Sequence, residues 1–267
     1  MADVSVLKIT DAAFAYGEQL IFQDITLETR PGEIFCLMGR NGCGKSTLLD
    51  CILGIHPLKK GTIQISDKSV DAYKPAELAK KMAYLPQSHE HSFPYKVLQV
   101  VLMSRNAYMS RFGSPTQEDK VIVKNLLNKI GITHLSDRPY TQLSGGELQM
   151  VMLARSLAQE APLILMDEPT AHLDYYNELL FLETIASLVK DGRQTIFMAT
   201  HSPNQAFYLE NRGIPVRVGL MCNGKLIETG PPAKTLTSAN LGQVYNIEAR
   251  ILDSGETKQV MPVGTLK

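Results

Sequence analysis

Apolar and polar residues alternate in the first part of the chain, in three short runs at Val4–Ile9, Ala12–Tyr16 and Ile25–Glu28. Such alternation is typical of half-buried β-strands. Turn-forming residues at Gly17-Glu18 and Arg30-Pro31-Gly32 separate the runs. The pattern therefore predicts an antiparallel β region near the N-terminus.

Continuous apolar runs indicate a second kind of strand. Apart from Thr195, every residue is apolar in Ile34–Met38, Leu163–Met166 and Thr195–Ala199. Such runs favour strands that are buried on both faces of a parallel sheet. Ser46–Leu53 has helical character and is followed by Gly54. Two further strands are predicted, at Thr62–Ile65 and Met82–Leu85.

Between about residue 88 and residue 160 the spacing of apolar residues becomes helical. Helices are predicted at Val97–Met103, Glu118–Ile130 and Glu147–Ala158. After the last buried run, Asn223-Gly224 lies between apolar residues in Leu220–Glu228, a strong signal for a β-hairpin. The segment that follows Gly230-Pro231-Pro232 is interpreted as a short tail.

Composition narrows the range of partners. Hydrophobic residues make up 44% of the 267 positions, enough for a substantial core, and the formal net charge is zero. Nucleic acid is disfavoured as the main partner, because phosphate backbones are bound by concentrated positive surfaces and no long basic run occurs. The four cysteines, at positions 36, 43, 51 and 222, have no metal-ligand spacing. We expect free thiols in a reducing cytosol.

No segment has the character of a signal peptide or of a membrane span. The beginning of the chain, MADVSVLKIT, contains the acidic Asp3 and no long apolar stretch. The longest apolar runs, such as Ile34–Met38, fall far short of the roughly 20 residues that a spanning helix needs. Any role at a membrane is therefore expected to be peripheral.

A glycine-rich loop follows the first buried run: Gly39-Arg40-Asn41-Gly42-Cys43-Gly44-Lys45-Ser46-Thr47. It matches the phosphate-loop pattern, with a strand expected before it and a helix after it. Its glycines permit a backbone in which successive N–H groups face phosphate oxygens. Lys45 would supply a positive charge to the β- and γ-phosphates, and the Ser46 hydroxyl would coordinate Mg²⁺. We interpret the loop as an ATP site; the alternative is a glycine-rich turn with an incidental lysine.

Two carboxylates, Asp167 and Glu168, directly follow the apolar run Leu163–Met166. The carboxyl ends of strands are where open α/β sheets bind their ligands. We expect Asp167 to help to hold Mg²⁺. Glu168 would polarise the attacking water as a general base.

Upstream of these carboxylates lies Leu143-Ser144-Gly145-Gly146-Glu147-Leu148-Gln149. With this motif the chain resembles the nucleotide-binding subunits of ATP-binding-cassette (ABC) transporters, whose signature is Leu-Ser-Gly-Gly-Gln. Glu147 replaces the usual glutamine and puts a carboxylate into the first turn of a helix, where the helix dipole favours it. Ser144, Gly145 and Gly146 are unchanged. The resemblance implies that their hydroxyl and backbone amides meet a γ-phosphate.

The resemblance extends over roughly residues 5–245 and implies roles for four more positions. Tyr16 matches the aromatic residue that stacks on adenine, and Gln87 matches the glutamine that touches Mg²⁺ and the attacking water. His201 matches the switch histidine that contacts the γ-phosphate. Ala171-His172-Leu173-Asp174 matches the loop that crosses the dimer interface, where Ser-Ala-Leu-Asp is commoner. We interpret His172 as structural. A kinase or small GTPase would share the phosphate loop but not this set of motifs.

The fold implied by the resemblance is α/β: a P-loop NTPase (RecA-like) core with an N-terminal antiparallel β subdomain and an inserted α-helical subdomain. Residues 1–87 would form the β subdomain and the first part of the core. Residues 88–160 would form the helical subdomain, residues 161–230 the second part of the core, and residues 231–267 a C-terminal tail.

The resemblance also implies an assembly. Two copies of the chain would form a head-to-tail homodimer, with each ATP between Gly39–Thr47 of one copy and Ser144–Gly146 of the other. Binding of ATP and Mg²⁺ would close the dimer, and hydrolysis would remove the γ-phosphate contacts that hold it. Two integral membrane permease subunits would dock on the helical subdomain, and a periplasmic or extracellular substrate-binding protein would act indirectly. The chain would lie in the cytoplasm, peripheral on the inner face of the cell membrane.

Three local features add hypotheses. Ser88–Arg111 is the candidate surface for the permease. Within it, His89-Glu90-His91 invites a metal interpretation, although histidines two apart in a loop are more often solvated. Cys43 lies near Lys45 and a helix N-terminus, which both lower the pKa of a thiol, so we expect a reactive cysteine that MgATP protects.

A weaker resemblance concerns the cargo. The phosphate loop, Pro203-Asn204-Gln205-Ala206 and the segment Gly230–Thr237 look like those of ATPases of metal-chelate importers, which carry iron–siderophores, haem, cobalamin or, in some members, molybdate or tungstate. The alternatives are other ABC importers or exporters and, less favoured, a soluble ABC ATPase of DNA repair or translation. The single cassette, the absence of a zinc spacing and the neutral charge speak against the soluble class.

Overall fold

The computed structural model describes residues 5–87, 93–109, 113–192, 194–255 and 257–266. The chain divides into two compact units. One consists of Met1–Tyr73 and Ala186–Lys267, and the other of Lys74–Ile185. Both units contain strands and helices, and the predicted α/β class is confirmed.

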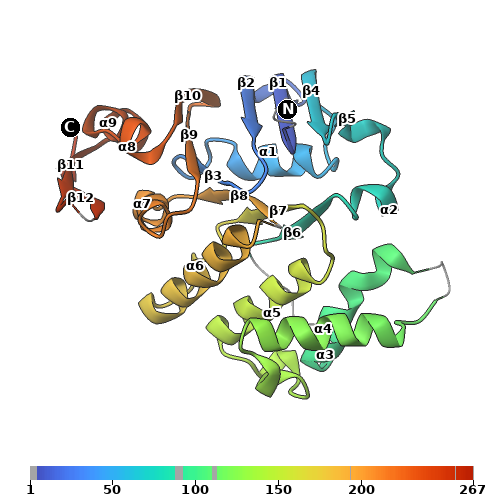
Figure 1. Cartoon of the computed structure of the whole chain (residues 1–267). Helices are drawn as coiled ribbons and strands as arrows, with labels where there is room; N and C mark the ends of the chain where they lie inside the picture. Colours follow the sequence, from blue (N-terminus) through green and yellow to red (C-terminus); the bar gives the residue numbers. More distant parts are fainter. Residues whose placement is uncertain (1–4, 88–92, 110–112, 193, 256, 267) are drawn as a thin grey trace. The chain divides into compact units, whose positions relative to one another are not determined.

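The first unit contains an antiparallel sheet with the strand order β2-β1-β4-β5 (Figure 1). Its strands are β1 (Leu7–Tyr16), β2 (Gln19–Thr29), β4 (Lys60–Ile65) and β5 (Lys68–Ser69). The alternating pattern predicts two strands where the structure has the single strand β1. The pattern breaks at Asp11 because a β-bulge lies there: Asp11 has a φ of 50°, and the pairing register shifts between Ile9 and Ala12.

The second sheet of this unit carries the predicted buried strands. β3 (Ile34–Met38) pairs in parallel with β8 (Thr195–Thr200) on one side and with β9 (Val216–Cys222) on the other. Every residue of β3 and β8 is buried, and the rings of Phe35 and Phe197 stack with centroids 5.1 Å apart. β10 (Lys225–Gly230) returns antiparallel to β9. The predicted hairpin is confirmed: Asn223 and Gly224, both at positive φ, form its turn.

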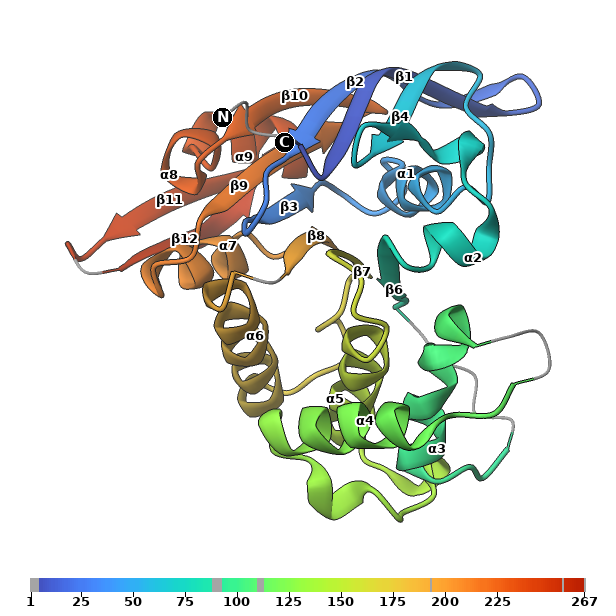
Figure 2. The same ribbon diagram turned by 45° about the vertical axis from the view of Figure 1, so that its right-hand side comes forward.

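The C-terminal segment contains regular structure where the sequence predicts a short tail. Two helices, α8 (Pro232–Thr235) and α9 (Ser238–Tyr245), precede a hairpin of β11 (Ile247–Asp253) and β12 (Lys258–Thr265). The hairpin lies beside α7 (Pro203–Asn211) and α9 (Figure 2). The side-chain amide of Asn204 accepts from the Val260 N–H at 2.7 Å and donates to the Val260 carbonyl at 3.2 Å. It thus makes with β12 the pair of hydrogen bonds that the backbone of a neighbouring strand would make. These contacts come from distant residues, which local sequence patterns do not reveal.

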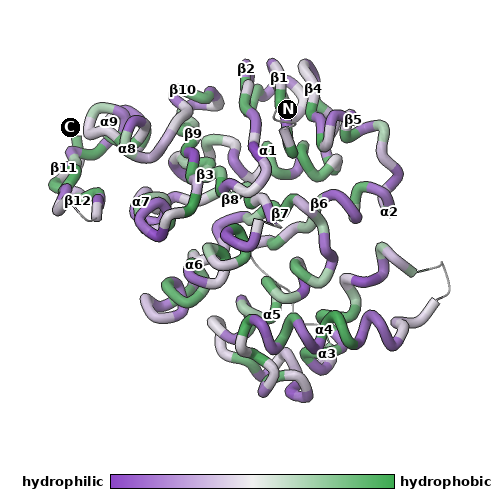
Figure 3. Tube along the Cα trace, viewed as in Figure 1, coloured by the Kyte–Doolittle hydropathy of each residue, from purple (hydrophilic) through white to green (hydrophobic). Residues whose placement is uncertain are grey.

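The second unit combines two parallel strands, β6 (Met82–Leu85) and β7 (Leu163–Asp167), with a group of helices. The three predicted helices are confirmed to within a few residues at each end. Figure 3 shows hydrophobic and hydrophilic positions recurring along α4, as expected for a helix with one buried face. No helix in the described ranges is long and apolar enough to cross a membrane. The α-helices that begin in this unit are α2 (Pro75–Leu78), α3 (Val97–Leu102), α4 (Gln117–Lys129), α5 (Gly145–Leu157) and α6 (Tyr175–Lys190).

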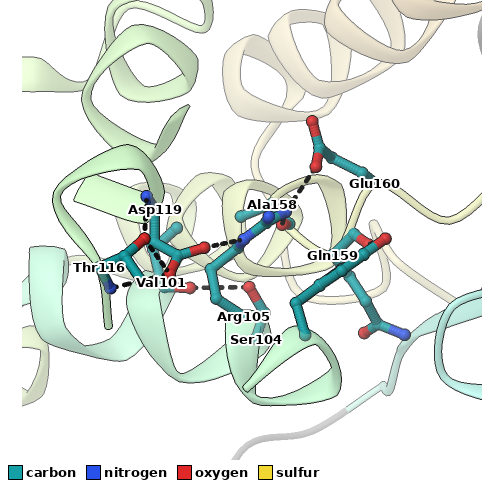
Figure 4. Close-up of polar contacts among 9 residues, drawn as sticks. Val101, Ser104, Arg105, Thr116, Asp119, Ala158, Gln159 and Glu160 are labelled. Carbon is teal, nitrogen blue, oxygen red and sulfur yellow. Dashed lines mark hydrogen bonds and ion pairs between the residues drawn. The ribbon is translucent and has the colours of Figure 1, made fainter. Parts of the chain in front are cut away.

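An ion-pair cluster around Arg105 joins three segments of the helical unit (Figure 4). The Arg105 side chain is almost fully buried. It donates to Asp119 at 2.8 Å, to the Ala158 carbonyl at 2.9 Å and to Glu160 at 2.6 Å. Asp119 also accepts from the N–H and the hydroxyl of Thr116, at 2.9 and 2.8 Å, and so caps the start of α4. The cluster thereby ties the first turn of α4 to the C-terminal end of α5.

Candidate active site

The glycine-rich loop lies between β3 and α1 (Lys45–Ile52) in the first unit, as the phosphate-loop pattern requires. Gly42 and Gly44 have φ values of 80° and 104°, and residues with a Cβ rarely adopt such backbone conformations. A Cβ on Gly44 would also lie 3.0 Å from Cε of Met221. The loop therefore depends on glycine at these positions for its shape.

Lys45 turns back over this loop from the first residue of α1. Its side chain is buried, and the ammonium donates to the Gly39 carbonyl at 2.9 Å and to the Arg40 carbonyl at 3.3 Å. Among the other predicted phosphate-binding residues of the loop, Arg40, Asn41 and Ser46 are exposed and Thr47 is half-buried. A positive charge and a hydroxyl thus flank a helix N-terminus, which is the arrangement that binds phosphate.

The prediction that the Cys43 thiol, beside Lys45 and a helix N-terminus, has a lowered pKa is wrong. Burial raises the pKa of the Cys43 thiol, and this effect outweighs the opposing influence of the Lys45 charge. Cys43 is only 9% exposed, and its sulfur packs against Gly39, where an added Cβ would lie 2.6 Å away. The sequence shows the neighbouring lysine but not the burial.

His201 directly follows β8, and the strand register brings it to the same edge of the sheet as the loop. Met38 is the pairing partner of Thr200 in the parallel strands β3 and β8. Gly39 and His201 are therefore each the first residue after the carboxyl end of one of these neighbouring strands. His201 is exposed. The turn behind it is fixed, because the Thr200 hydroxyl donates to Gln205 at 2.8 Å and accepts from the Ser202 N–H at 3.1 Å.

Tyr16 lies at the end of β1 with 48% of its surface exposed. Its ring packs edge-on against Phe14, with centroids 4.9 Å apart, and its hydroxyl lies 3.1 Å from Nε2 of His56. About half of Tyr16 is exposed, and its stacking on adenine stays a prediction. His56 is a neighbour that the motif comparison does not include.

In the second unit, the structure brings Gln87 and Glu168 together. Leu85 pairs with Met166 in the parallel register of β6 and β7, so both polar side chains follow the carboxyl ends of adjacent strands. Nε2 of Gln87 lies 3.5 Å from Oε2 of Glu168. Glu168 has a φ of 43°, an unusual conformation for a residue with a long side chain. Asp167, one residue earlier, is buried.

The signature motif forms the start of α5 in the same unit. Ser144 is the capping residue: its hydroxyl accepts from the Glu147 N–H at 3.3 Å. Ser144 and Gly145 are exposed, whereas Gly146 is buried. The side chain of Asn177, from α6, fills the space that a Cβ on Gly146 would need. The signature motif thus places a hydroxyl and backbone amides at a helix N-terminus, a position that favours an anion.

The predicted metal motif and the predicted permease surface lie wholly or partly outside the described residues. His89-Glu90-His91 lies outside the described residues, as do parts of Ser88–Arg111. The described part of that segment carries four exposed apolar side chains: Phe93, Tyr95, Met103 and Tyr108. Over the described ranges, no group of three or more histidine, cysteine or acidic side chains is arranged to hold a metal ion.

Comparison with known proteins assigns these motifs to one family. Residues 22–171 match the family model for "ABC transporter". The chain is 34% identical over 242 residues to the molybdate import ATP-binding protein MolC of Haemophilus influenzae, covering 90% of this chain and 88% of that protein. It is 35% identical over 251 residues to the hemin import ATP-binding protein HmuV of Thermobifida fusca, covering 93% and 86%.

A solved structure agrees with this assignment. It is described as an inward-facing conformation of a metal-chelate type ABC transporter, shares 31% sequence identity and superimposes with a TM-score of 0.84 over 97% of this chain and 98% of that one. ATP-binding subunits of this kind are ATPases coupled to transport, and they work with membrane permease components. The chain described here belongs to the ABC transporter family, as an ATP-binding subunit.

Proposed function

We propose that this chain hydrolyses ATP to energise the uptake of a metal chelate through a membrane permease. The cargo would be an iron–siderophore, haem, cobalamin, molybdate or tungstate. The similarity to import subunits along more than 85% of both chains carries the proposal. The relatives named for molybdate and hemin import support the class of cargo.

Two parts of the chain would share the chemistry of hydrolysis. Gly39–Thr47 would bind the phosphates, and Glu168 would act as general base on the attacking water, with Gln87 and His201 contacting the water and the γ-phosphate. The observed approach of Gln87 to Glu168 supports their common role. The signature residues Ser144–Gly146 would complete the site of a second copy in a homodimer.

Mg²⁺ fits the donor atoms that the family pattern provides. Ser46, Gln87 and Asp167 offer a hydroxyl, an amide carbonyl and a carboxylate, which are the oxygen ligands that Mg²⁺ prefers. When bound, the ion would neutralise charge on the phosphate oxygens. These residues form the proposed metal set.

The permease would dock on the described part of Ser88–Arg111. Its exposed apolar side chains support this proposal, and two of them, Phe93 and Tyr95, lie together with ring centroids 6.0 Å apart. Adjoining exposed apolar residues often mark interaction surfaces. The chain would therefore lie on the cytoplasmic face of the cell membrane, and a substrate-binding protein on the other side would deliver the cargo.

Purification of the tagged chain from membranes tests the proposal. We expect an integral membrane subunit to co-purify with the chain. The genes beside the gene for this chain should include one for that permease. In proteoliposomes, the complex should take up a labelled metal chelate only with ATP. Recovery of ribosomes or DNA in place of a membrane protein would overturn the proposal, and uptake of a cargo other than a chelate would overturn its finer part.

A further inference from the structure

The N-terminus of α5 already holds one negative charge, that of Glu147. Oε2 of its carboxylate accepts from the Ser144 N–H at 2.8 Å and from the Ser144 hydroxyl at 3.0 Å. These are two of the donors that a phosphate would use at a helix start. Glutamate in place of the usual glutamine therefore affects phosphate binding, because it puts a negative charge beside the signature serine, Ser144.

Arg138 binds the other oxygen of this carboxylate. Its Nη1 donates to Oε1 of Glu147 at 3.0 Å, and its Nη2 donates to the Gln142 carbonyl at 3.1 Å. The hydrogen bond from the Ser144 backbone, with further help from the Ser144 hydroxyl and Arg138, holds the pKa of Glu147 below its usual value. Glu147 is thus ionised at neutral pH, and Arg138 is the cation that balances it.

The position of Arg138 is fixed by a backbone ladder rather than by burial of its side chain. The Arg138 carbonyl accepts from the Val97 N–H at 3.0 Å, and the Ser136 carbonyl accepts from the Leu98 N–H at 3.0 Å. On the far side, the Tyr140 N–H donates to the Tyr95 carbonyl at 2.9 Å. Three backbone hydrogen bonds thus hold Arg138 against the start of α3, within reach of Glu147.

A phosphate that approaches Ser144 would meet this charge pair. With Arg138 in place the local charge is close to neutral, and the helix dipole favours an anion. Without Arg138, the carboxylate of Glu147 would repel the phosphate. We propose that Arg138 is a positioning residue for nucleotide binding by the signature motif, because it offsets the negative charge of Glu147 beside Ser144. The proposal rests on the proposed composite site, in which Ser144–Gly146 meets the γ-phosphate.

A double-mutant cycle on the full chain tests the pair, with phosphate release measured against MgATP concentration. In Arg138→Gln, we expect KM for MgATP to rise about three- to tenfold, the scale of one unbalanced charge in a partly solvated site. Glu147→Gln keeps the capping geometry, since glutamine serves at this helix position. The double variant Arg138→Gln/Glu147→Gln should therefore return to within about twofold of the Glu147→Gln value.

Two controls separate positioning from folding. Melting temperatures should hardly change, because exposed ion pairs add little stability. Lys96 and Asp137 form a comparable exposed ion pair at 2.9 Å on the same ladder, and Asp137→Asn should leave KM unchanged. An unchanged KM in Arg138→Gln, or a raised KM that Glu147→Gln fails to reverse, would overturn the proposal.

A further variant distinguishes failure of this pair from failure of the composite site. Ser144→Asp adds a second negative charge at the helix start, where a γ-phosphate is proposed to bind. If Ser144→Asp impairs turnover and Arg138→Gln does not, the role of Arg138 is wrong and the composite site stands. If neither variant alters KM or kcat, both proposals fail.

Discussion

The side-chain amide of Asn177 lies against Gly146, in the space where a Cβ on that glycine would be. Asn177 is itself held in place, because its backbone N–H and its amide both donate to the Asp174 carboxylate, at 2.8 and 3.0 Å. The first turn of α5 therefore packs directly on the first turn of α6. The signature motif and the segment Ala171–Asp174 are joined by this contact, although they are separate motifs in the sequence.

Gly146→Ala should lower ATP turnover by at least about tenfold, because the added methyl group must displace Asn177 or the start of α5. Replacing Asn177 by alanine as well provides the space, so the double variant should be less impaired than Gly146→Ala alone. Phosphate release by the two single variants and the double variant measures the coupling. Strictly additive losses would contradict the steric explanation.

Glu168→Gln should lower turnover by about 100-fold or more, the scale of losing a positioned general base, and should leave ATP binding intact. The side chain keeps its size, and glutamine can still face Gln87. Phosphate release and equilibrium binding of a fluorescent ATP analogue measure the two properties. Near-normal phosphate release by this variant would rule out Glu168 as the base.

Tyr16→Ala should raise KM for MgATP about tenfold, since stacking of an aromatic ring on a base contributes roughly 1–3 kcal/mol. Tyr16→Phe retains the ring and loses the hydroxyl contact with His56, so it should remain within about twofold of the wild type. Comparison of the two variants separates stacking from the hydrogen bond. Equal losses in both would assign the effect to the hydroxyl.

Alkylation should proceed slowly at Cys43 and more quickly at Cys222. Cys43 is buried with a raised pKa, whereas Cys222 is half-buried. Cys36 and Cys51 should hardly react, because burial raises the pKa of each to about 12. Since only the thiolate reacts, the rate at Cys43 should rise as the pH is increased above 8. Mass spectrometry of iodoacetamide-treated protein gives the order of reaction.

A control identifies the thiol that matters for activity. In Cys222→Ser, slow inactivation and its prevention by MgATP should persist, because we expect them to arise at Cys43. Fast inactivation that the Cys222→Ser substitution abolishes would place the sensitive thiol outside the phosphate loop.

Local patterns were sufficient for the elements that carry the site. Ile34–Met38 and Thr195–Thr200 are strands because continuous apolar runs need burial on both faces. Their parallel register then places Gly39 and His201 side by side. The contact of Gln87 with Glu168 follows from the same logic in β6 and β7. A motif that follows a buried strand is thus predictable in both type and position.

Contacts between distant residues were not predictable in this way. Burial raises the pKa of Cys43, and the phosphate loop packs at Gly44 against Met221 and Ile21, which are far away in sequence. The hairpin β11–β12 depends on Asn204, more than 50 residues earlier. The roles of Arg138 and Asn177 depend on which side chains meet in the folded unit, and no spacing rule in a single sequence encodes that.

The buried pair of Arg105 and Asp119 should make part of the stability depend on pH. The hydrogen bond from Arg105, followed by those from Thr116, lowers the pKa of Asp119 from 3.8 to about 2. Because this pKa is depressed on folding, the stabilising contribution is fully present above about pH 4 and is lost as the pH falls through about 2. Asp119→Asn should lower the free energy of unfolding at pH 7 by about 3 kcal/mol, since it leaves Arg105 buried without this partner.

Urea denaturation followed by circular dichroism at pH 7 and at pH 3 measures this contribution. The gap between the wild type and Asp119→Asn should narrow at pH 3, because protonation begins to remove the same carboxylate charge from the wild type. Glu118→Gln is the matched control: Glu118 occupies the same first turn of α4 but is exposed, so its replacement should change stability little at either pH. A gap that is equal at both pH values would show that the loss in Asp119→Asn arises from the helix cap rather than from the ion pair.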